Sequence, residues 1–95
     1  MKFLEDYGFS QEEFEEFMNN TPKKLIDKLE EHEDLVRVNL QFVKDLGTSV
    51  YKEIFINYPD IFLLDASVFA KTFTQYETDE LIESLNNNFK VVEYL

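Results

Sequence analysis

Only two glycines and two prolines occur in the 95 residues of this chain, which leaves too few turn residues for a fold built from hairpins. Gly8 and Gly47 each follow a short amphipathic stretch, and Pro22 and Pro59 each separate two such stretches. Glycine is favoured just beyond a helix C-terminus, and proline at the first position of a helix. The sequence therefore predicts an all-α fold with five to six short helices.

Capping patterns predict where the helices of the first third begin. Ser10 and Glu13 have the spacing of a capping box, and the flanking Phe9 and Phe14 have that of a hydrophobic staple. Thr21 is expected to cap the next helix, which begins at a proline. The side chains expected to face inward in this third are Phe3, Leu4, Tyr7, Phe14, Phe17, Met18, Leu25, Ile26 and Leu29.

The helix expected to end at Gly47 has the widest apolar face of the chain and should be the central one. The pattern leaves open whether the preceding helix breaks near His32, with Asp34 as a new cap, or continues. Two rows of apolar residues line the central helix: Leu35, Val38, Phe42 and Leu46 in one, and Val36, Leu40 and Val43 in the other.

In the second half, Thr48 or Ser49 is expected to cap a helix that Pro59 ends. The apolar residues 61–64 read better as a buried turn than as a strand, which would have no partner. Asp65 should cap the next helix, with Leu64 and Phe69 as a staple, and an apolar row should run through Phe73 to Tyr76. Thr78 should cap the last helix, through Asn88. Residues 89–95 fit a last helical turn, a strand or the stub of a further repeat.

Part of the chain resembles another part of itself. Residues 3–10 align with residues 42–49, so that in both places a short amphipathic helix ends at glycine, a capped helix follows and a proline comes next. A shorter third copy begins near Phe73 and lacks the glycine. This pattern predicts one domain over residues 1–95, with repeats at 3–39, 40–72 and, in part, 73–95.

The order of these signals resembles the mTERF family. The passage that carries the resemblance runs from Leu40–Gly47 through Tyr58–Leu64. The resemblance implies helical repeats of about thirty residues that stack into a curved solenoid, and it implies nucleic-acid binding through basic residues. A compact helical bundle with the same caps remains the alternative architecture.

Charge argues against the function that the resemblance implies. Twenty acids and nine bases give a net charge of −11, which repels phosphate backbones and anionic lipid surfaces. The acids concentrate at the two ends of the chain. Residues 1–34 hold eleven acids and four bases, residues 35–76 four of each, and residues 77–95 five acids and one base.

The acidic runs are the candidate partner-binding residues: Glu12, Glu13, Glu15, Glu16, Glu30, Glu31, Glu33 and Asp34. The bland interpretation, which the residues favour, is a solvated helix face, since acids are favourable in the first turn of a helix. The functional interpretation is a docking surface for a basic protein.

Lys23, Lys24 and Lys28 form the one basic cluster and are the candidate nucleic-acid contacts of the alternative interpretation. Asp27, Glu30 and Glu31 lie beside them in sequence, so ion pairs within the helix are expected to occupy these lysines. Aromatic residues at helical spacing are expected in the core and not on a base-stacking surface.

No catalytic, cofactor or metal site is predicted. The chain has no cysteine and only one histidine, His32, and it lacks the nucleophile, phosphate-loop, zinc and calcium motifs. The first ten residues carry acids where a secretory or transit peptide carries bases, and no apolar run approaches a membrane span, so a cytoplasmic protein is expected.

These patterns together favour a non-enzymatic protein-interaction module. Nucleic-acid binding by analogy with the mTERF family is the alternative, and an acidic mimic of nucleic acid that occupies a basic partner is another. The sequence does not predict the oligomeric state.

Overall fold

Helices account for all the regular structure of the computed structural model, which describes residues 1–95. The elements, with η for 3-10 helices, are η1 (Lys2–Tyr7), α1 (Gln11–Asn20), α2 (Lys23–Glu31), α3 (Glu33–Leu46), α4 (Tyr51–Asn57), η2 (Pro59–Leu63), α5 (Ala66–Thr74), α6 (Thr78–Asn87) and η3 (Phe89–Tyr94). The all-α prediction is confirmed. The count exceeds the predicted five to six because three segments form 3-10 helices beside the six α-helices.

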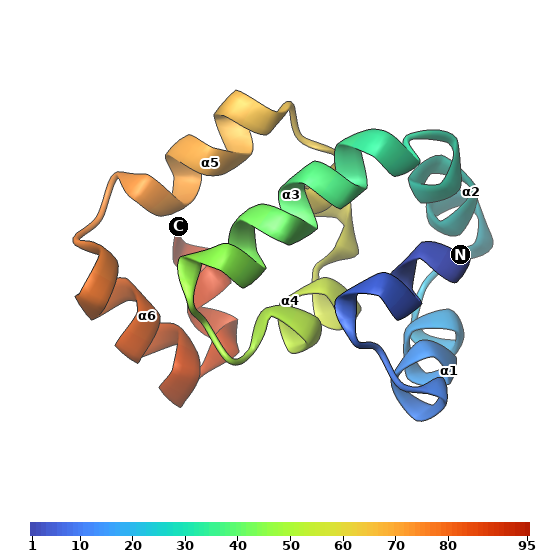
Figure 1. Ribbon diagram of the computed structural model, residues 1–95, viewed down its shortest axis with the longest axis horizontal. Coiled ribbons are helices and arrows are strands. Elements are labelled where there is room, and N and C mark those ends of the chain that lie inside the picture. The colour runs from blue at the N-terminus through green and yellow to red at the C-terminus, as the bar shows by residue number, and fades with distance from the viewer.

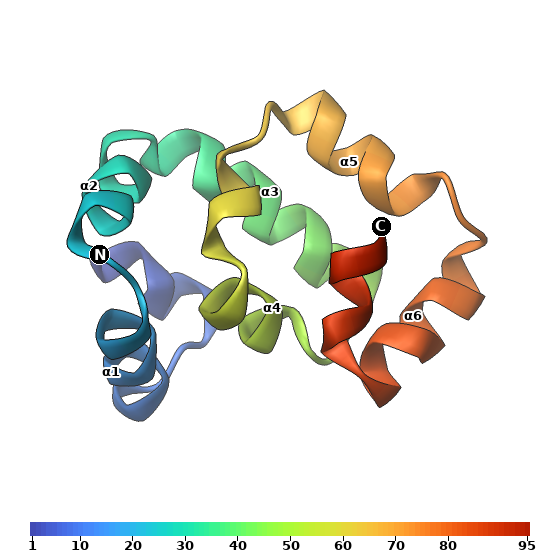
Figure 2. The same ribbon diagram turned by 180° about the vertical axis from the view of Figure 1, so that it is seen from behind.

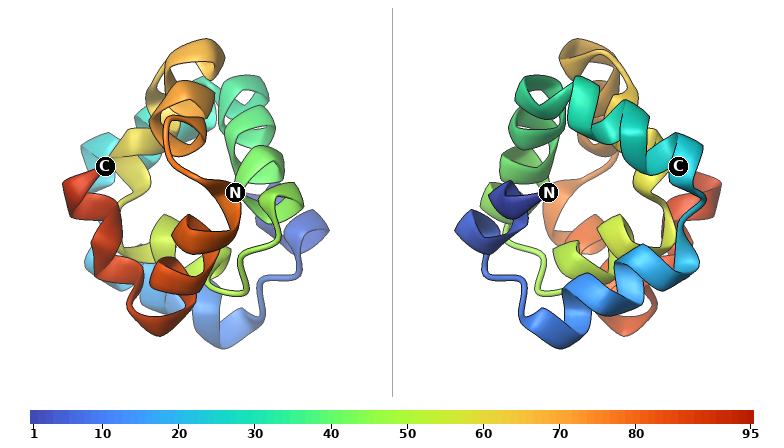
Figure 3. Two further views of the ribbon diagram at one scale, coloured as in Figure 1. Left: turned by 90° about the vertical axis from the view of Figure 1, so that its left-hand side faces the viewer. Right: turned by 90° about the vertical axis from the view of Figure 1, so that its right-hand side faces the viewer.

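The longest helix, α3, crosses the middle of the molecule (Figure 1). The helices α1 and α2 form one end of the molecule, and α5 and α6 form the other (Figures 1 and 2). Each end faces the viewer in one panel of Figure 3. The molecule measures 34 × 26 × 22 Å along its principal axes, and no helix is long and apolar enough to cross a membrane.

One hydrophobic cluster holds the elements together, with phenylalanine rings at its centre. The ring centroid of Phe55, on α4, lies 5.7 Å from that of Phe9, 4.9 Å from that of Phe17 and 5.1 Å from that of Phe62. Aromatic pairs at such distances contribute beyond the area that they bury. The fully buried Phe55 therefore joins η2 to the N-terminal end of the molecule.

Two predicted helix caps are confirmed. The Ser10 hydroxyl accepts the amide hydrogen of Glu13 at 3.1 Å, and the Glu13 carboxylate accepts that of Ser10 at 2.8 Å, which completes the capping box. Asp65 caps α5 by accepting the Ser67 amide at 3.0 Å and the Ser67 hydroxyl at 2.7 Å. These hydrogen bonds lower the pKa of Asp65.

The predicted threonine and serine caps are wrong at three other helix starts. The cap of α2 is Pro22, and the hydroxyl of the preceding Thr21 is buried without a hydrogen-bond partner. The cap of α6 is Glu77, because its backbone is extended whereas Thr78 is already helical. The cap of α4 is Val50, whose amide donates to the Thr48 hydroxyl at 3.2 Å.

The structure resolves the three segments that the sequence left open. The helix is interrupted at His32, which caps both the end of α2 and the start of α3. Asp34 therefore does not serve as the cap. The helix α4 ends before Pro59, which begins η2, so residues 61–63 belong to a 3-10 helix and not to a strand, and Leu64 follows with an extended backbone. The last residues form η3, whose Val92 is buried and whose first turn is capped by Asn88.

Four side chains expected to face inward are more exposed than predicted. In α3 the row with Val36, Leu40 and Val43 is fully buried, but Val38 of the other row is 54% exposed. The other three are Met18, Leu64 and Tyr76. An amphipathic pattern predicts which face of a helix is apolar, but coverage of that face depends on a neighbouring element. No element covers these positions completely.

Both glycines adopt the left-handed conformation beyond a helix end, with φ of 83° at Gly8 and 99° at Gly47. Each turn also lies against the fourth helix that follows it in the chain. A β-carbon on Gly8 would lie 3.5 Å from the Tyr51 hydroxyl on α4, and one on Gly47 would lie 3.8 Å from the Ile82 side chain on α6. Each glycine turn therefore lies next to a helix from a later part of the chain.

Candidate functional site

The acids of α1 differ from one another in their surroundings. Glu12, Glu15 and Glu16, here called the α1 acidic face, are exposed and take part in no ion pair. The helix contains no basic residue. At this end of the molecule the α1 acidic face is a negatively charged surface without an internal counter-charge.

Glu13 has a structural role. Its carboxylate accepts from Ser10 and forms an ion pair with Lys52, on α4, with 3.4 Å between the Oε1 and Nζ atoms. Desolvation by burial acts to raise the pKa of Glu13, but the hydrogen bonds from Ser10 and the charge of Lys52 outweigh it, so that the pKa is lowered. This predicted docking residue is therefore engaged within the fold.

The second acidic run lies at the corner between α2 and α3. Glu33 is bound to Arg37, and Glu30 lies 4.0 Å from the N-terminal amino group. Glu31 and Asp34 are exposed and form no ion pair. The structure thus places both acidic runs at the same end of the molecule and leaves some members of each run without a counter-charge.

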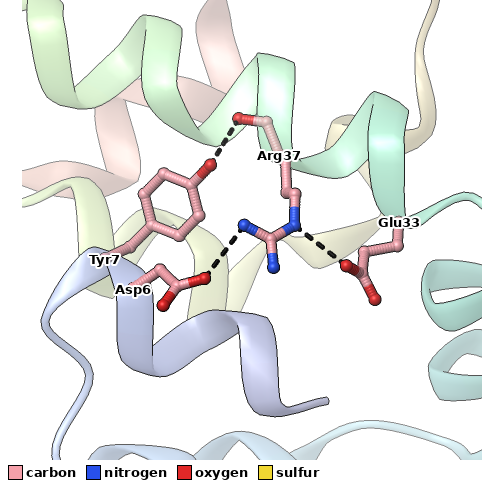
Figure 4. A network of polar contacts seen from close by, with 4 residues as sticks. All are labelled: Asp6, Tyr7, Glu33 and Arg37. Atoms are coloured by element: carbon pink, nitrogen blue, oxygen red, sulfur yellow. Dashed lines mark hydrogen bonds and ion pairs between the residues drawn. The ribbon is translucent and has the colours of Figure 1, made fainter.

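Arg37, the one arginine of the chain, holds η1 against α3 (Figure 4). Its Nε donates to Glu33 at 2.9 Å and its Nη1 donates to Asp6 at 3.0 Å, while the Tyr7 hydroxyl donates to its backbone carbonyl at 3.3 Å. The guanidinium also lies 5.3 Å from the ring centroid of Phe3. Hydrogen bonds to the two carboxylates, that to Glu33 first, raise the pKa of Arg37.

The lysines of the alternative interpretation lie together on α2. Lys23, Lys24 and Lys28 are exposed, and none of them forms an ion pair with a neighbouring acid. The expected pairing within the helix is therefore wrong. Lysine side chains in water retain full solvation and rotamer freedom, and an exposed pair gains little against that. His32 is exposed at the α2–α3 corner, and no group of three or more acids and histidines is arranged to hold a metal ion.

A further surface, which sequence reasoning missed, lies between α6 and η3. This C-terminal groove has a volume of about 290 Å³, and it is lined by Tyr76, Glu77, Glu80, Leu81, Ser84, Val91, Tyr94 and Leu95. Tyr76 and Tyr94 are 43% and 84% exposed. The groove therefore combines exposed aromatic rings with two carboxylates. Tyr76 was expected in the core, but it lines this groove, and its apolar spacing gave no signal of that.

A polar contact attaches α6 to the centre of the molecule. The side-chain oxygen of Asn86 accepts from the hydroxyl of Thr48 at 2.9 Å, and from the amide and hydroxyl of Ser49 at 3.0 and 3.1 Å. At the other glycine turn, the Tyr51 hydroxyl donates to the Tyr7 carbonyl at 2.7 Å. Each glycine turn is thus held by a polar side chain from a later helix.

No protein-family model, curated protein or solved structure matches this chain.

Proposed function

We propose that this chain is a non-enzymatic protein-interaction module that binds a basic surface of another protein through the α1 acidic face. One observation carries the proposal. Glu12, Glu15 and Glu16 are exposed on a helix without a base and have no ion-pair partner in the fold. A basic partner would supply the missing counter-charge.

The charge balance of the whole molecule supports this choice of partner. Ion pairs engage only four of the twenty acids, namely Asp6, Glu13, Glu30 and Glu33. The remaining charge produces a negative potential that accelerates encounter with a positively charged protein and slows encounter with nucleic acid.

The polar side-chain contacts described above support a non-enzymatic module, because they have structural roles. Ser10 and Glu13 begin a helix, Arg37 joins η1 to α3, and Asn86 joins α6 to the turn after Gly47.

The proposed architecture is a short array of mTERF-like repeats, and the order of the elements supports it. Three consecutive triplets, η1–α1–α2, α3–α4–η2 and α5–α6–η3, make up the chain. Four of the six pairs of corresponding elements in neighbouring triplets pack side by side: η1 and α3, α3 and α5, α1 and α4, and α2 and η2. The equivalent surroundings of the two glycine turns fit the same scheme.

Nucleic-acid binding is the second candidate, because Lys23, Lys24 and Lys28 are free of ion pairs. Phosphate contacts are strongest at low salt. Titration with duplex and single-stranded nucleic acid at about 50 mM salt should show binding that a Lys-to-Gln triple variant loses, and no binding there rejects this candidate.

An acidic mimic of nucleic acid is the third candidate. It predicts that competing DNA releases the bound protein partner.

The proposal is tested by comparing which proteins bind to the wild type and to two matched variants. The test variant carries Glu12→Gln, Glu15→Gln and Glu16→Gln, and the control carries Asp45→Asn, Glu53→Gln and Asp60→Asn. All six positions are exposed, and both variants lose the same charge. A protein retained by the wild type and the control, lost by the test variant and released by salt supports the proposal. Equal retention by the test variant contradicts it.

A further inference from the structure

The contact between α1 and α4 shows how the start of one helix of this chain is covered by a later helix. Phe9, just before the cap of α1, is only 6% exposed because the rings of Tyr51 and Phe55 lie against it, with centroids 6.5 and 5.7 Å away. Lys52, the neighbour of Tyr51, forms the ion pair with Glu13. A helix with an aromatic residue, a lysine and a second aromatic residue thus covers the N-terminal part of α1.

The beginning of α6 repeats this receiving surface. Counted from the caps, Ser10 of α1 and Glu77 of α6, the position of Phe9 corresponds to Tyr76. Tyr76 is 43% exposed, in contrast to the buried Phe9. The two residues differ in exposure because α4 covers Phe9, whereas no α-helix covers Tyr76 in the same way.

The charged position is repeated as well. Glu80 stands three residues after its cap, as Glu13 does, and it lines the C-terminal groove without an ion-pair partner. Glu77, Asp79 and Glu83 lie nearby in sequence, and α6 contains no base. A cation can therefore pair with Glu80 as Lys52 pairs with Glu13.

The groove also has room for a large apolar side chain. Ser84 stands four residues after Glu80, where α1 carries Phe17, whose ring stacks on that of Phe55 at 4.9 Å. The smaller side chain of Ser84 lines the groove, together with Leu81 and Val91, where a phenylalanine would fill part of the space. An aromatic residue of an incoming helix fits this space, as Phe55 fits against α1.

We propose that the C-terminal groove binds an amphipathic helix of a partner protein that carries an aromatic residue, a lysine or arginine at the next position, and a second aromatic residue three positions further. The cation pairs with Glu80 and the aromatic residues cover Tyr76 and Ser84, in the manner of Tyr51, Lys52 and Phe55 on α1. This inference rests on the proposed function as an interaction module, and it adds a second binding surface and the chemistry of its ligand.

A partner protein fits the groove better than a second copy of the chain. The chain's own helix with this pattern, α4, is occupied in the fold, with Ile54, Phe55 and Ile56 buried. A second copy would also bring a further net charge of −11 to an acidic surface. The charge of the groove selects a basic helix.

A peptide titration tests the inference. The probe is a fluorescein-labelled, alanine-based helical peptide that carries tyrosine, lysine and phenylalanine at the relative positions of Tyr51, Lys52 and Phe55. The variant is Glu80→Lys, and the matched control is Glu83→Lys, which makes the same charge change on α6 at an exposed position that does not line the groove. Circular dichroism verifies that both variants keep the wild-type helix content.

The wild type and Glu83→Lys should bind the peptide alike, and Glu80→Lys should bind it about tenfold more weakly. A second peptide with glutamate in place of lysine should reverse the order and prefer Glu80→Lys. Absence of wild-type binding, or equal loss in both variants, overturns the inference. Sedimentation that shows a dimer which Glu80→Lys dissociates also overturns it, and assigns the groove to a second copy.

Failure of this test leaves the α1 proposal intact, because the two surfaces lie at opposite ends of the molecule (Figure 1). The variant with Glu12→Gln, Glu15→Gln and Glu16→Gln should bind the peptide within about twofold of the wild type, since those acids are far from the groove. Loss of peptide binding in that variant contradicts binding in the groove.

Discussion

The side-chain nitrogen of Asn39, in the middle of α3, donates a hydrogen bond of 2.9 Å to the backbone carbonyl of Phe62, in η2. The same nitrogen donates to the carbonyl of Leu64 at 2.9 Å, and the residue is 1% exposed. One buried amide thus satisfies two carbonyls near the end of η2. It explains why a polar residue lies among the buried positions of the central helix.

Asn39→Ala should lower the free energy of unfolding by about 2–3 kcal/mol, because it leaves two carbonyls without their donor. Asn57→Ala removes an exposed amide that donates only to the Glu53 carbonyl of its own helix, and should change stability by less than about 0.5 kcal/mol. Urea denaturation measures both. Equal stability of the two variants would show that Asn39 does not anchor η2.

Gly47→Ala should destabilise the fold by about 1–2 kcal/mol, because φ is 99° and an L-residue is strained there. The nearest atom to an added β-carbon is 3.8 Å away on Ile82, so no steric clash contributes. Gly47→Asn should cost less than Gly47→Ala, since asparagine tolerates the left-handed region. Thermal unfolding of the alanine and asparagine variants distinguishes backbone strain from steric crowding, which the larger asparagine would increase. An alanine variant as stable as the wild type would contradict the assignment of strain to Gly47.

Ser10→Ala should cost about 1 kcal/mol, because it removes the acceptor for the Glu13 amide. Thr78→Ala is the informative comparison. The sequence pattern predicts a cap at both positions, but the Thr78 side chain makes no capping bond, so its replacement should be nearly neutral. Chemical denaturation of the two variants compares the expectation with the structure. A large loss at Thr78 would support the sequence pattern instead.

The Tyr58 hydroxyl donates to the Glu93 carboxylate at 2.7 Å and joins α4 to η3. This hydrogen bond, with desolvation and the charge of Glu93, raises the pKa of Tyr58 to about 12. Because the folded pKa lies above the ordinary value of about 10, the contribution to stability is complete below pH 10 and is lost as the pH rises towards 12. Unfolding measured between these values should show the loss in the wild type. Tyr58→Phe should remove this pH dependence, and an unchanged dependence would exclude Tyr58 as its source.

Local signals predicted the parts of the fold that depend on a few neighbouring residues. Ser10 and Asp65 cap their helices as expected, and both glycines end a helix, because the atoms involved lie within four residues of one another. The prediction of Thr78 as a cap failed because a cap residue requires an extended backbone, which occurs one residue earlier, at Glu77.

The exposure of apolar residues and the candidate binding surfaces could not be predicted in the same way. Whether Val38 or Tyr76 is covered depends on elements that pack from a distance in sequence. Glu13 and Glu12 are neighbours in one acidic run, yet only Glu13 meets Lys52, which lies 39 residues further along the chain. The structure separates engaged acids from free ones, and it assembles the groove from two elements.

Site-specific photo-crosslinking inside cells tests the claim of a protein-interaction module most directly. A photoreactive phenylalanine replaces Glu16 on the α1 acidic face, and the control position is Asp45, an exposed acid in the last turn of α3. A discrete protein adduct at residue 16 that is absent at residue 45 is the predicted result. Adducts with nucleic acid alone, or no adduct at residue 16 that differs from the control, would contradict the account.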